Sequence, residues 1–388
     1  MVLASAGEQP LVRPEGGLHI PLDDPQRALA LIDDHIARHG PFQAVIGTDD
    51  STVPLASAVA ARLALAHNPV EAVRLVRRKD LARARLAEAG VRVPRHRVID
   101  TRVPLAPQLA DFPFPCVVKP VSMSGSRGVI RADDQEALLR AASRARAIAA
   151  GLEDPDERER LLIEAFIPGM EVALEGLLRG GRLTPIALFD KPDPLDGPFF
   201  EETYYVTPSR LPGSVREQVA QEVERACRAY GLCEGPVHAE CRINDDGAWI
   251  LEVAARTIGG LCSRLFTLGA GRDLEDVVLG HALGTTQEVS MAGGAGGVLM
   301  IPIPGAGILR RVEGVLDAQR VPGVAEVVIA VREGYELVPL PEGDSYLGFI
   351  FARAATPERA EEALREAHAR LRVVVAPLWK IDPASQAG

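Results

Sequence analysis

The sequence predicts an α/β (α+β) fold in three parts: a small N-terminal α/β lobe over residues 1–75, a central part of two subdomains over residues 76–290 and a C-terminal β-rich domain over residues 291–388. At 388 residues the chain exceeds a typical domain of roughly 100 to 200 residues, so several packed units are expected. Short apolar runs alternate with helical patterns in the first part, and a β-rich stretch with one late helix follows a glycine-rich segment.

Within the first half of the chain, local patterns predict each element in turn. The apolar run 44–47 and the helical pattern 54–66 indicate the N-terminal lobe. The segment 77–90 (RRKDLARARLAEAG) has a helical pattern that ends at a glycine. Two β-rich runs, CVVKP (116–120) and GVIRADD (128–134), flank a turn rich in serine and glycine.

The second half is predicted in the same way from periodicity and from glycine and proline breaks. The expected elements are a charged helix over 134–151, a strand pair over 161–178, a helix over 214–230, a hairpin over 237–253, a glycine-rich linker over 290–298 and a late helix over 356–371.

Composition excludes several classes of function. With 47% hydrophobic and 25% charged residues, the chain is typical of globular proteins, and no apolar run reaches the ~20 residues of a membrane span. The N-terminus lacks a secretory pattern, which predicts a cytoplasmic location. A net charge of −10 disfavours nucleic-acid binding. Five cysteines without a C-x-x-C pair disfavour a disulfide framework and a structural zinc site.

Lysine is rare in this chain. Of the 43 basic residues only four are lysines, Lys79, Lys119, Lys191 and Lys380. Because arginine serves as the general surface cation here, a retained lysine is a candidate contact for phosphate or carboxylate, where a compact ammonium fits better than a planar guanidinium. Lys380, near the tail, is interpreted as chance retention.

The segment HAECRINDDGAWILEVAAR (238–256) predicts the clearest chemistry. A three-residue loop, Asp245-Asp246-Gly247, would place Asn244 opposite Ala248 and therefore Glu240 opposite Glu252. Period two then puts six side chains on one face: His238, Glu240, Arg242, Glu252, Ala254 and Arg256. Facing carboxylates repel each other, so a hard divalent cation, Mg²⁺ or Mn²⁺, is expected between them. The alternative is a hairpin with a merely polar, solvated outer face.

Two further segments have the chemistry of a nucleotide site. Lys119 ends an apolar run, and the following loop 122–128 is small enough for backbone N–H groups to approach phosphates, although it is not a Walker A loop. A flexible hairpin is the alternative. Downstream, residues 164–167 could present backbone groups to adenine, with Glu171 accepting from ribose hydroxyls. The alternative there is a β-hairpin with glutamates that face solvent.

Taken in order, RKD, VVKP, SGSRGV, IEAFIPGMEV, HAECR and LEVAAR resemble the ATP-grasp superfamily over residues 40–290. Within it, EVAAR (252–256) and FDKPDPLDGPFFEETYYVTPSRLP are most similar to L-amino acid ligases that form dipeptides. The resemblance implies an ATP-grasp fold with a shortened N-terminal lobe, and the C-terminal part resembles the extra β-domain of biotin carboxylase-like and dipeptide-ligase members.

The resemblance also implies a role for individual residues. ATP would be bound by Lys79 and Lys119 at the phosphates, by the loop residues Ser124, Gly125, Ser126 and Gly128, by Glu164, Ala165, Phe166 and Ile167 at adenine, and by Glu171 at ribose. Glu240 and Glu252 would bind magnesium. The implied catalytic residues are Arg256, Lys119, His238 and Glu202, with Glu202, His238 and Lys191 near the acceptor pocket. Ala254 departs from D-alanine ligase-like enzymes, which have asparagine there.

These observations predict an ADP-forming carboxylate–amine ligase that works through an acyl phosphate, with an L-amino acid as substrate. ATP and Mg²⁺ (or Mn²⁺) are the expected cofactors. Small-molecule carboxylates and amines are the expected partners, with neither nucleic acid nor membrane and with a homodimer as one assembly state. The alternatives are a biotin carboxylase-like or purine-pathway ligase of a small acid, and a non-catalytic ATP-binding regulatory protein.

Overall fold

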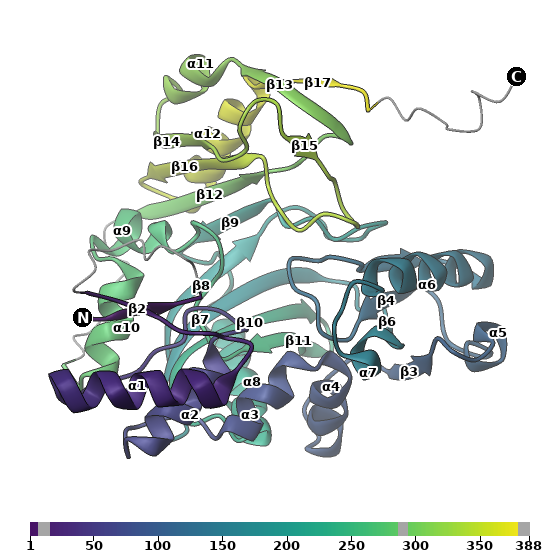
Figure 1. Ribbon diagram of the computed structural model, residues 1–388. Coiled ribbons are helices and arrows are strands. Elements are labelled where there is room, and N and C mark those ends of the chain that lie inside the picture. Colours follow the sequence, from purple (N-terminus) through teal and green to yellow (C-terminus); the bar gives the residue numbers. More distant parts are fainter. Residues whose placement is uncertain (7–15, 286–293, 379–388) are drawn as a thin grey trace, which may run out of the picture.

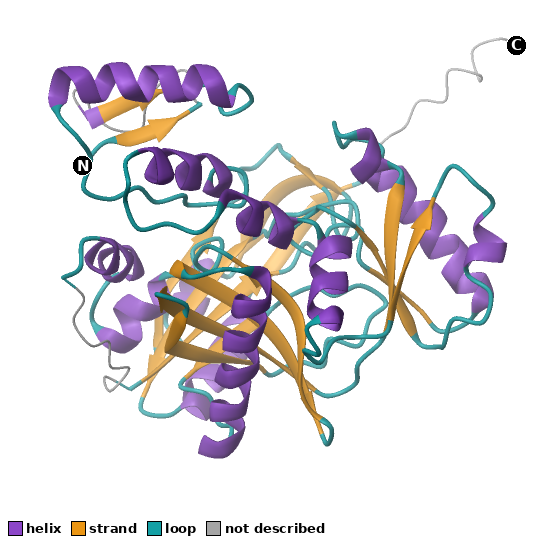
Figure 2. Cartoon of the chain, turned by 90° about the horizontal axis from the view of Figure 1, so that it is seen from below, coloured by secondary structure: helices purple, strands orange, loops and turns teal. Residues whose placement is uncertain are grey.

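The computed structural model describes residues 1–6, 16–285 and 294–378 and arranges them in four β-sheets with helices on their outer faces (Figures 1 and 2). Lys380 and residues 290–293 of the predicted linker lie outside the described residues. No helix among the described residues is long and apolar enough to cross a membrane.

The N-terminal lobe contains a two-stranded parallel sheet and three helices. Its elements are β1 (Leu3–Ser5), β2 (Gly17–His19), α1 (Pro25–His39), α2 (Val53–Arg62) and α3 (Val70–Arg77). Ile32 of α1 and Val59 of α2 share its small core, and Figure 2 shows α1 beside the two strands. The predicted helix 54–66 is confirmed as α2. The apolar run 44–47 forms no strand, because an extended segment needs a hydrogen-bonded neighbour to become one.

The smaller half of the central part is a four-stranded antiparallel sheet with strand order β3-β6-β4-β5. Its elements are β3 (His96–Asp100), α5 (Leu105–Gln108), β4 (Cys116–Pro120), β5 (Ile130–Ala132), α6 (Gln135–Ala149), α7 (Pro155–Arg158) and β6 (Arg160–Ala165). The predicted strand pair around the serine-glycine turn is confirmed as β4 and β5. Asp134 caps α6 by accepting from the Ala137 N–H. This helix packs on the sheet through Leu138 and Ala142.

An eight-stranded sheet joins the larger half of the central part to the C-terminal domain, in the order β11-β10-β7-β8-β9-β12-β16-β14. Its strands are β7 (Met170–Arg179), β8 (Arg182–Lys191), β9 (Tyr204–Thr207), β10 (Glu234–Asn244), β11 (Gly247–Ala254), β12 (Ala295–Ile301), β14 (Val324–Ile329) and β16 (Gly348–Ala354). A three-stranded sheet completes the C-terminal domain with β13 (Gly307–Glu313), β15 (Glu336–Leu337) and β17 (Arg372–Ala376).

Helices cover the large sheet and extend the two cores. They are α4 (Lys79–Glu88), α8 (Gly213–Tyr230), α9 (Arg264–Ala270), α10 (Leu274–Ala282), α11 (Val315–Gln319) and α12 (Pro357–Ala369). The predicted helices 77–90, 214–230 and 356–371 are confirmed as α4, α8 and α12. Val219 and Val223 of α8 pack against Cys241 of β10 in the largest of the hydrophobic clusters among the described residues.

Two segments differ from the prediction. Residues 295–298, assigned to a linker, are buried in β12, where a Cβ on Gly297 would lie 2.8 Å from the side chain of Leu364. The glycines there allow close packing of α12. The predicted strand pair 161–178 is not a hairpin, since β6 pairs with β3 and β4, while β7 pairs with β8 and β10.

The connection between β6 and β7 therefore passes from the small sheet to the large one. Gly169 makes this possible: its φ is +124°, and a Cβ there would lie 2.1 Å from the carbonyl oxygen of Ile243. Residues 164–167 consequently lie between the two sheets rather than at a solvent-exposed turn.

Candidate active site

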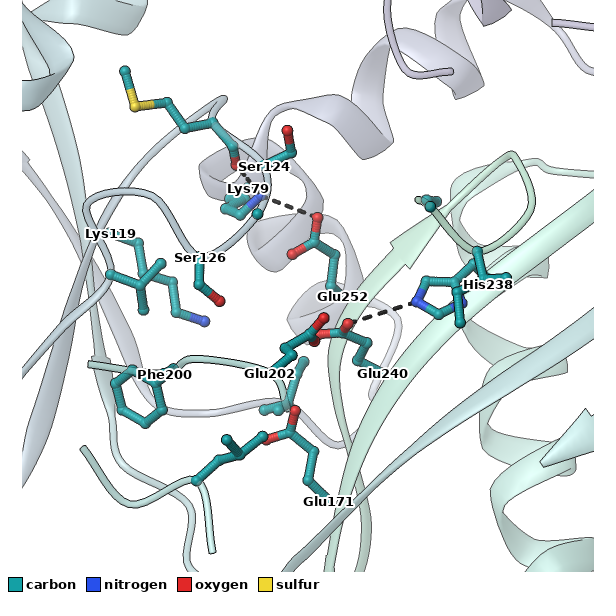
Figure 3. Close-up of a pocket in the computed structure, with 18 of the residues that line it drawn as sticks. Lys79, Lys119, Ser124, Ser126, Glu171, Phe200, Glu202, His238, Glu240 and Glu252 are labelled. Carbon is teal, nitrogen blue, oxygen red and sulfur yellow. Dashed lines mark hydrogen bonds and ion pairs between the residues drawn. The ribbon is translucent and has the colours of Figure 1, made fainter. Parts of the chain in front are cut away.

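A cavity of about 350 Å³ lies between the small and large sheets and is bounded by the C-terminal domain. Figure 3 shows its side chains converging from both sheets. The predicted site residues that line it are Lys79, Lys119, Ser124, Gly125, Ser126, Glu164, Ala165, Phe166, Ile167, Glu171, Glu202, His238, Glu240, Glu252 and Arg256. Gly128 does not line it and instead packs against Pro120. Lys191 lies behind its wall, bound to three of its carboxylates.

The β10–β11 hairpin has the predicted pairing of Glu240 with Glu252, but by a different route. Asn244 pairs with Gly247, not with Ala248, so the turn has two residues rather than three. The Asn244 side chain closes this turn by accepting from the Asp246 N–H at 3.0 Å.

A β-bulge then restores the predicted register. Cys241 pairs with Ile250 and Glu240 with Glu252, which leaves Leu251 as the extra residue. Arg83 of α4 donates to the carbonyl oxygens of Ile250 and Leu251, at 2.7 Å each. The bulge is therefore held from outside the hairpin, at the position that brings the two carboxylates together.

Glu252 and Glu240 have different cationic partners. Lys79 Nζ lies 3.1 Å from Glu252 and donates to the Met123 carbonyl oxygen at 2.8 Å. It thereby ties the loop after β4 to the large sheet. Lys191 Nζ lies 3.2 Å from Glu240. Both carboxylates are thus anchored by an ammonium and still face the same cavity, as Figure 3 shows.

A cluster of three carboxylates lies around Lys191. Its Nζ is 2.8 Å from Glu171 and 2.5 Å from Glu202. The three carboxylates, Glu171, Glu202 and Glu240, each have one oxygen within 4.8 Å of an oxygen of the other two. Arg242 also binds Glu171, at 2.9 Å. Burial lowers the pKa of Lys191, but the surrounding carboxylates raise it well above its usual value, so the ammonium stays charged. Glu171 is therefore engaged by two cations, and its predicted contact with ribose stays a prediction.

Within this cluster the pKa values of Glu202 and Glu240 are shifted in opposite directions. Burial and the neighbouring Glu240 raise the pKa of Glu202 to about 7. Burial also raises the pKa of Glu240, but Lys191 and His238 outweigh it and hold that pKa well below the usual value. Glu240 is therefore ionised near neutral pH, and Glu202 can bind or release a proton there.

His238 is held by a carboxylate behind the cavity wall. Its Nδ1 lies 2.5 Å from Glu175 on β7, and its Nε2 lies 3.6 Å from Glu240. Burial lowers the pKa of the imidazole, but Glu175 and then Glu240 raise it to about 9. His238 thus adds positive charge beside Glu240 at neutral pH.

On the small sheet, Lys119 and Glu164 form a buried ion pair. Lys119 Nζ lies 2.7 Å from Glu164, whose other oxygen accepts from Arg83. Burial raises the pKa of Glu164, but Arg83 and Lys119 lower it to about 2. Because Arg83 also binds β11, this carboxylate links the two sheets at the edge of the cavity.

Phe166, which follows β6, supplies an aromatic surface on the same wall. The guanidinium carbons of Arg131 and Arg242 lie 4.5 and 4.8 Å from its ring centre, and Phe200 lies 6.3 Å away. Flat apolar surface beside extended backbone suits a heterocyclic base, in keeping with the adenine contact predicted for residues 164–167.

The serine-glycine loop is docked against the C-terminal domain. The Gly128 N–H donates to the Pro341 carbonyl oxygen at 2.8 Å, and Arg127 Nε donates to that of Glu342 at 3.0 Å. The Glu342 carboxylate is bound in turn by Arg144 of α6, at 2.6 and 2.9 Å. The C-terminal domain thus holds the loop over the cavity.

Comparison with known families agrees with this architecture. Residues 112–264 match the ATP-grasp domain, and residues 299–376 match the L-amino acid ligase C-terminal domain 2. The chain contains an ATP-grasp domain over residues 112–264. A crystal structure of L-amino acid ligase from Bacillus licheniformis superimposes with a TM-score of 0.75 at 25% identity, covering 93% of this chain and 87% of that one. The family resemblance and the fold predicted from the sequence are confirmed.

Curated sequences of ligases are also similar to this chain. A D-alanine–D-alanine ligase of Ectopseudomonas mendocina is 28% identical over 49% of this chain and 59% of its own length. An alanine–anticapsin ligase of Bacillus subtilis is 24% identical over 51% of this chain and 45% of its own length. An uncharacterised protein of Sinorhizobium fredii is 28% identical over 79% of this chain and 62% of its own length. The matched part of the chain thus spans about half to three fifths of the length of each of these relatives.

Sequence reasoning missed the contribution of the N-terminal lobe to the site. Asp50 binds Arg256 through Nε and Nη2, at 3.0 and 2.9 Å, while Arg256 Nη1 donates to the Thr257 carbonyl oxygen at 2.8 Å. The loop that carries Asp50 is fixed by its own hydrogen bonds, since Asp49 accepts from the Ser51 N–H at 2.8 Å. The run TDDST (48–52) has the composition of such a turn and could have indicated a rigid loop. It could not have indicated that the loop contacts Arg256.

We expect Asp50→Asn to lower kcat about tenfold and to change the KM for ATP little. The amide can no longer form the charge-assisted pair that orients Arg256, an interaction of about 1.5–3 kcal/mol when buried and less at this half-exposed site. Steady-state kinetics would measure the effect, and Asp50→Glu should recover part of it. Asp34→Asn, which breaks an exposed ion pair on α1, is the control. A wild-type kcat in Asp50→Asn would contradict the orienting role.

Proposed function

We propose that this ATP-grasp protein is an ATP-dependent, magnesium-requiring carboxylate–amine ligase that forms an amide from an amino acid through an acyl phosphate. One observation carries the proposal. Opposed carboxylates on the large sheet, Glu240 and Glu252, share one cavity with Lys119 and with the serine-glycine loop 124–126 of the small sheet. Anion-binding groups and metal-binding groups thus face each other across a space that can hold a nucleotide.

Glu240 and Glu252 would hold the metal ion. Carboxylate oxygens are hard ligands that suit Mg²⁺ or Mn²⁺, and these two already face each other across a strand pair despite their mutual repulsion. The bound ion would neutralise phosphate charge on ATP. Ala254, next on that face of β11, offers no side-chain oxygen ligand, so this face of the hairpin supplies two carboxylates, Glu240 and Glu252.

Other side chains of the cavity would position the phosphates and exclude water. Lys79 and Lys119 would contact the phosphates, and Arg256 would stabilise the charge on the phosphoryl group as it moves to the substrate carboxylate. The docked loop 122–128 would keep water away from the acyl phosphate, which hydrolyses readily.

Glu202 is the group we assign to the acceptor amine. In the second step the amine nitrogen bonds to the acyl carbon, phosphate leaves with the bonding electrons, and the amine loses a proton. Glu202 lines the cavity beside Glu240 and, as a carboxylate, can accept that proton. Tyr205 donates to its other oxygen at 2.9 Å and so fixes its orientation.

The test is a screen of amino acids, singly and in pairs, for ATP-dependent phosphate release, with mass spectrometry of the products. A ligase should release phosphate well above background only with both a carboxyl donor and an amine, and the product mass should equal the two substrates minus one water. Bicarbonate with biotin controls for the small-acid alternative, and ATP alone controls for hydrolysis. Stimulation by bicarbonate but by no amine would overturn the proposal. Tight ATP binding without turnover would favour a regulatory protein.

The cytoplasmic location, a homodimer and the domain boundaries at residues 75 and 290 stay predictions. They affect how the protein is purified and dissected, but the proposed reaction does not depend on them.

A further inference from the structure

Resting on the proposed function, we infer that the amino acid that donates the carboxyl group has a large apolar side chain. The inference comes from one end of the active-site cavity, here called the apolar end. It is lined by Ile258, Cys262, Met300, Tyr346 and Phe349.

The apolar end is built from three separate segments. Ile258 and Cys262 follow β11, Met300 lies on β12, Tyr346 precedes β16 and Phe349 lies on it. Ile258, Cys262, Met300 and Phe349 belong to one hydrophobic cluster in the interior of the protein, and Tyr346 packs against it. Four of these residues are at most 8% exposed, so binding here is favoured chiefly by the apolar surface that a substrate side chain removes from water.

This wall is adjacent to the reacting groups. Tyr205, whose hydroxyl donates to Glu202 at 2.9 Å, belongs to the same hydrophobic cluster. Arg256 lies two residues before Ile258 in the sequence and lines the same cavity. A carboxylate placed at Arg256 would therefore have its side chain within reach of the apolar end.

Two consecutive glycines leave room for that side chain. Gly259 and Gly260 both line the cavity and are exposed. At Gly259 the backbone is in an ordinary conformation, and a Cβ would meet no atom within 4 Å. A residue with a side chain would fit there without strain, so no backbone requirement explains the glycine at this position.

The five residues of the apolar end favour an uncharged side chain. They have no ionised group near neutral pH, because burial raises the pKa of the Cys262 thiol and of the Tyr346 phenol. An ionised substrate side chain placed against these five residues would lose its hydration without gaining a charged partner from them.

The experiment measures amino-acid hydroxamates formed from ATP, magnesium, hydroxylamine and one amino acid at a time, because the hydroxamate reports only the amino acid that acted as the carboxyl donor. Leucine, methionine and phenylalanine should exceed alanine in kcat/KM by at least about tenfold, since one methylene in an apolar pocket alone changes it roughly 10- to 200-fold. Aspartate and lysine should fall below alanine. Equal or better use of alanine, aspartate or lysine would overturn the inference.

A variant that adds a side chain at Gly259 tests whether the side chain of the donor amino acid binds at the apolar end. Gly259→Val should lower the kcat/KM ratio of phenylalanine to alanine at least about fivefold. The matched control is Gly151→Val, at an exposed glycine where an added Cβ likewise meets no atom within 4 Å and which does not line the cavity. An unchanged ratio in a folded Gly259→Val protein would overturn the assignment of the subsite, and the wild-type donor series decides the substrate class independently.

The two proposals fail in different ways. If no amino acid yields a hydroxamate while ATP still binds, the proposed ligase function fails. If hydroxamates form but small or charged donors are preferred, the ligase function stands and only the large apolar donor is wrong.

Discussion

Glu252→Gln is expected to lower magnesium-dependent ATP turnover at least about 100-fold and to leave the fold intact. Removing an outer-shell partner of a metal ligand already costs about 10- to 100-fold, and Glu252 would be a direct ligand. The amide is nearly isosteric but lacks the negative charge that a divalent cation requires. Steady-state ATP turnover over a magnesium titration would measure the loss, with a higher magnesium requirement as its signature.

Stability should change little in the same variant. Glu252 is about a third exposed and its pairing with Lys79 is partly solvated, and such pairs contribute about 0–1 kcal/mol. The matched control is Asp246→Asn, which makes the same change in an exposed residue at the turn of the same hairpin. Wild-type turnover in Glu252→Gln, or an equal loss in Asp246→Asn, would contradict the metal-binding role.

The facing carboxylates could be predicted because a hairpin has few degrees of freedom. The turn residues set an approximate register, and period two determines which side chains share a face. The prediction missed both the two-residue turn and the bulge at Leu251, and these two differences cancel at Glu240 and Glu252. The bulge depends on Arg83, which is more than 160 residues away in the sequence, so no local pattern could reveal it.

Contacts between segments distant in sequence account for the other differences. The chain from β6 to β7 has two strand patterns around a Pro-Gly turn, which is what a hairpin requires, and only their pairing with other strands separates them into two sheets. The cluster around Lys191 could be anticipated in part, since a rare lysine marked it. Its three carboxylate partners come from β7, β10 and the segment before β9, and their meeting point is set by the sheet order.

Lys119→Arg tests whether position 119 requires a lysine, which is rare in this chain, rather than any positively charged side chain. Lys119 lies on buried strand β4 with its side chain 15% exposed, and its ammonium is 2.7 Å from Glu164. A guanidinium can keep the ion pair with Glu164, which Arg83 also holds, so the unfolding temperature should stay near that of the wild type. The larger planar group cannot place a compact charge on a phosphate in the same narrow space.

The expected result is a rise of roughly 10- to 150-fold in the KM for ATP, equivalent to one charged hydrogen bond of about 1.5–3 kcal/mol. Nucleotide titration by calorimetry and steady-state kinetics would measure binding and turnover separately. Arg140→Lys on the exposed face of α6 controls for an arginine–lysine exchange that touches no ligand, and Lys119→Met shows the effect of removing the charge entirely. If Lys119→Arg binds and turns over ATP like the wild type while Lys119→Met does not, any cation suffices at this position, and the rarity of lysine elsewhere in the chain carries no information about the phosphate site.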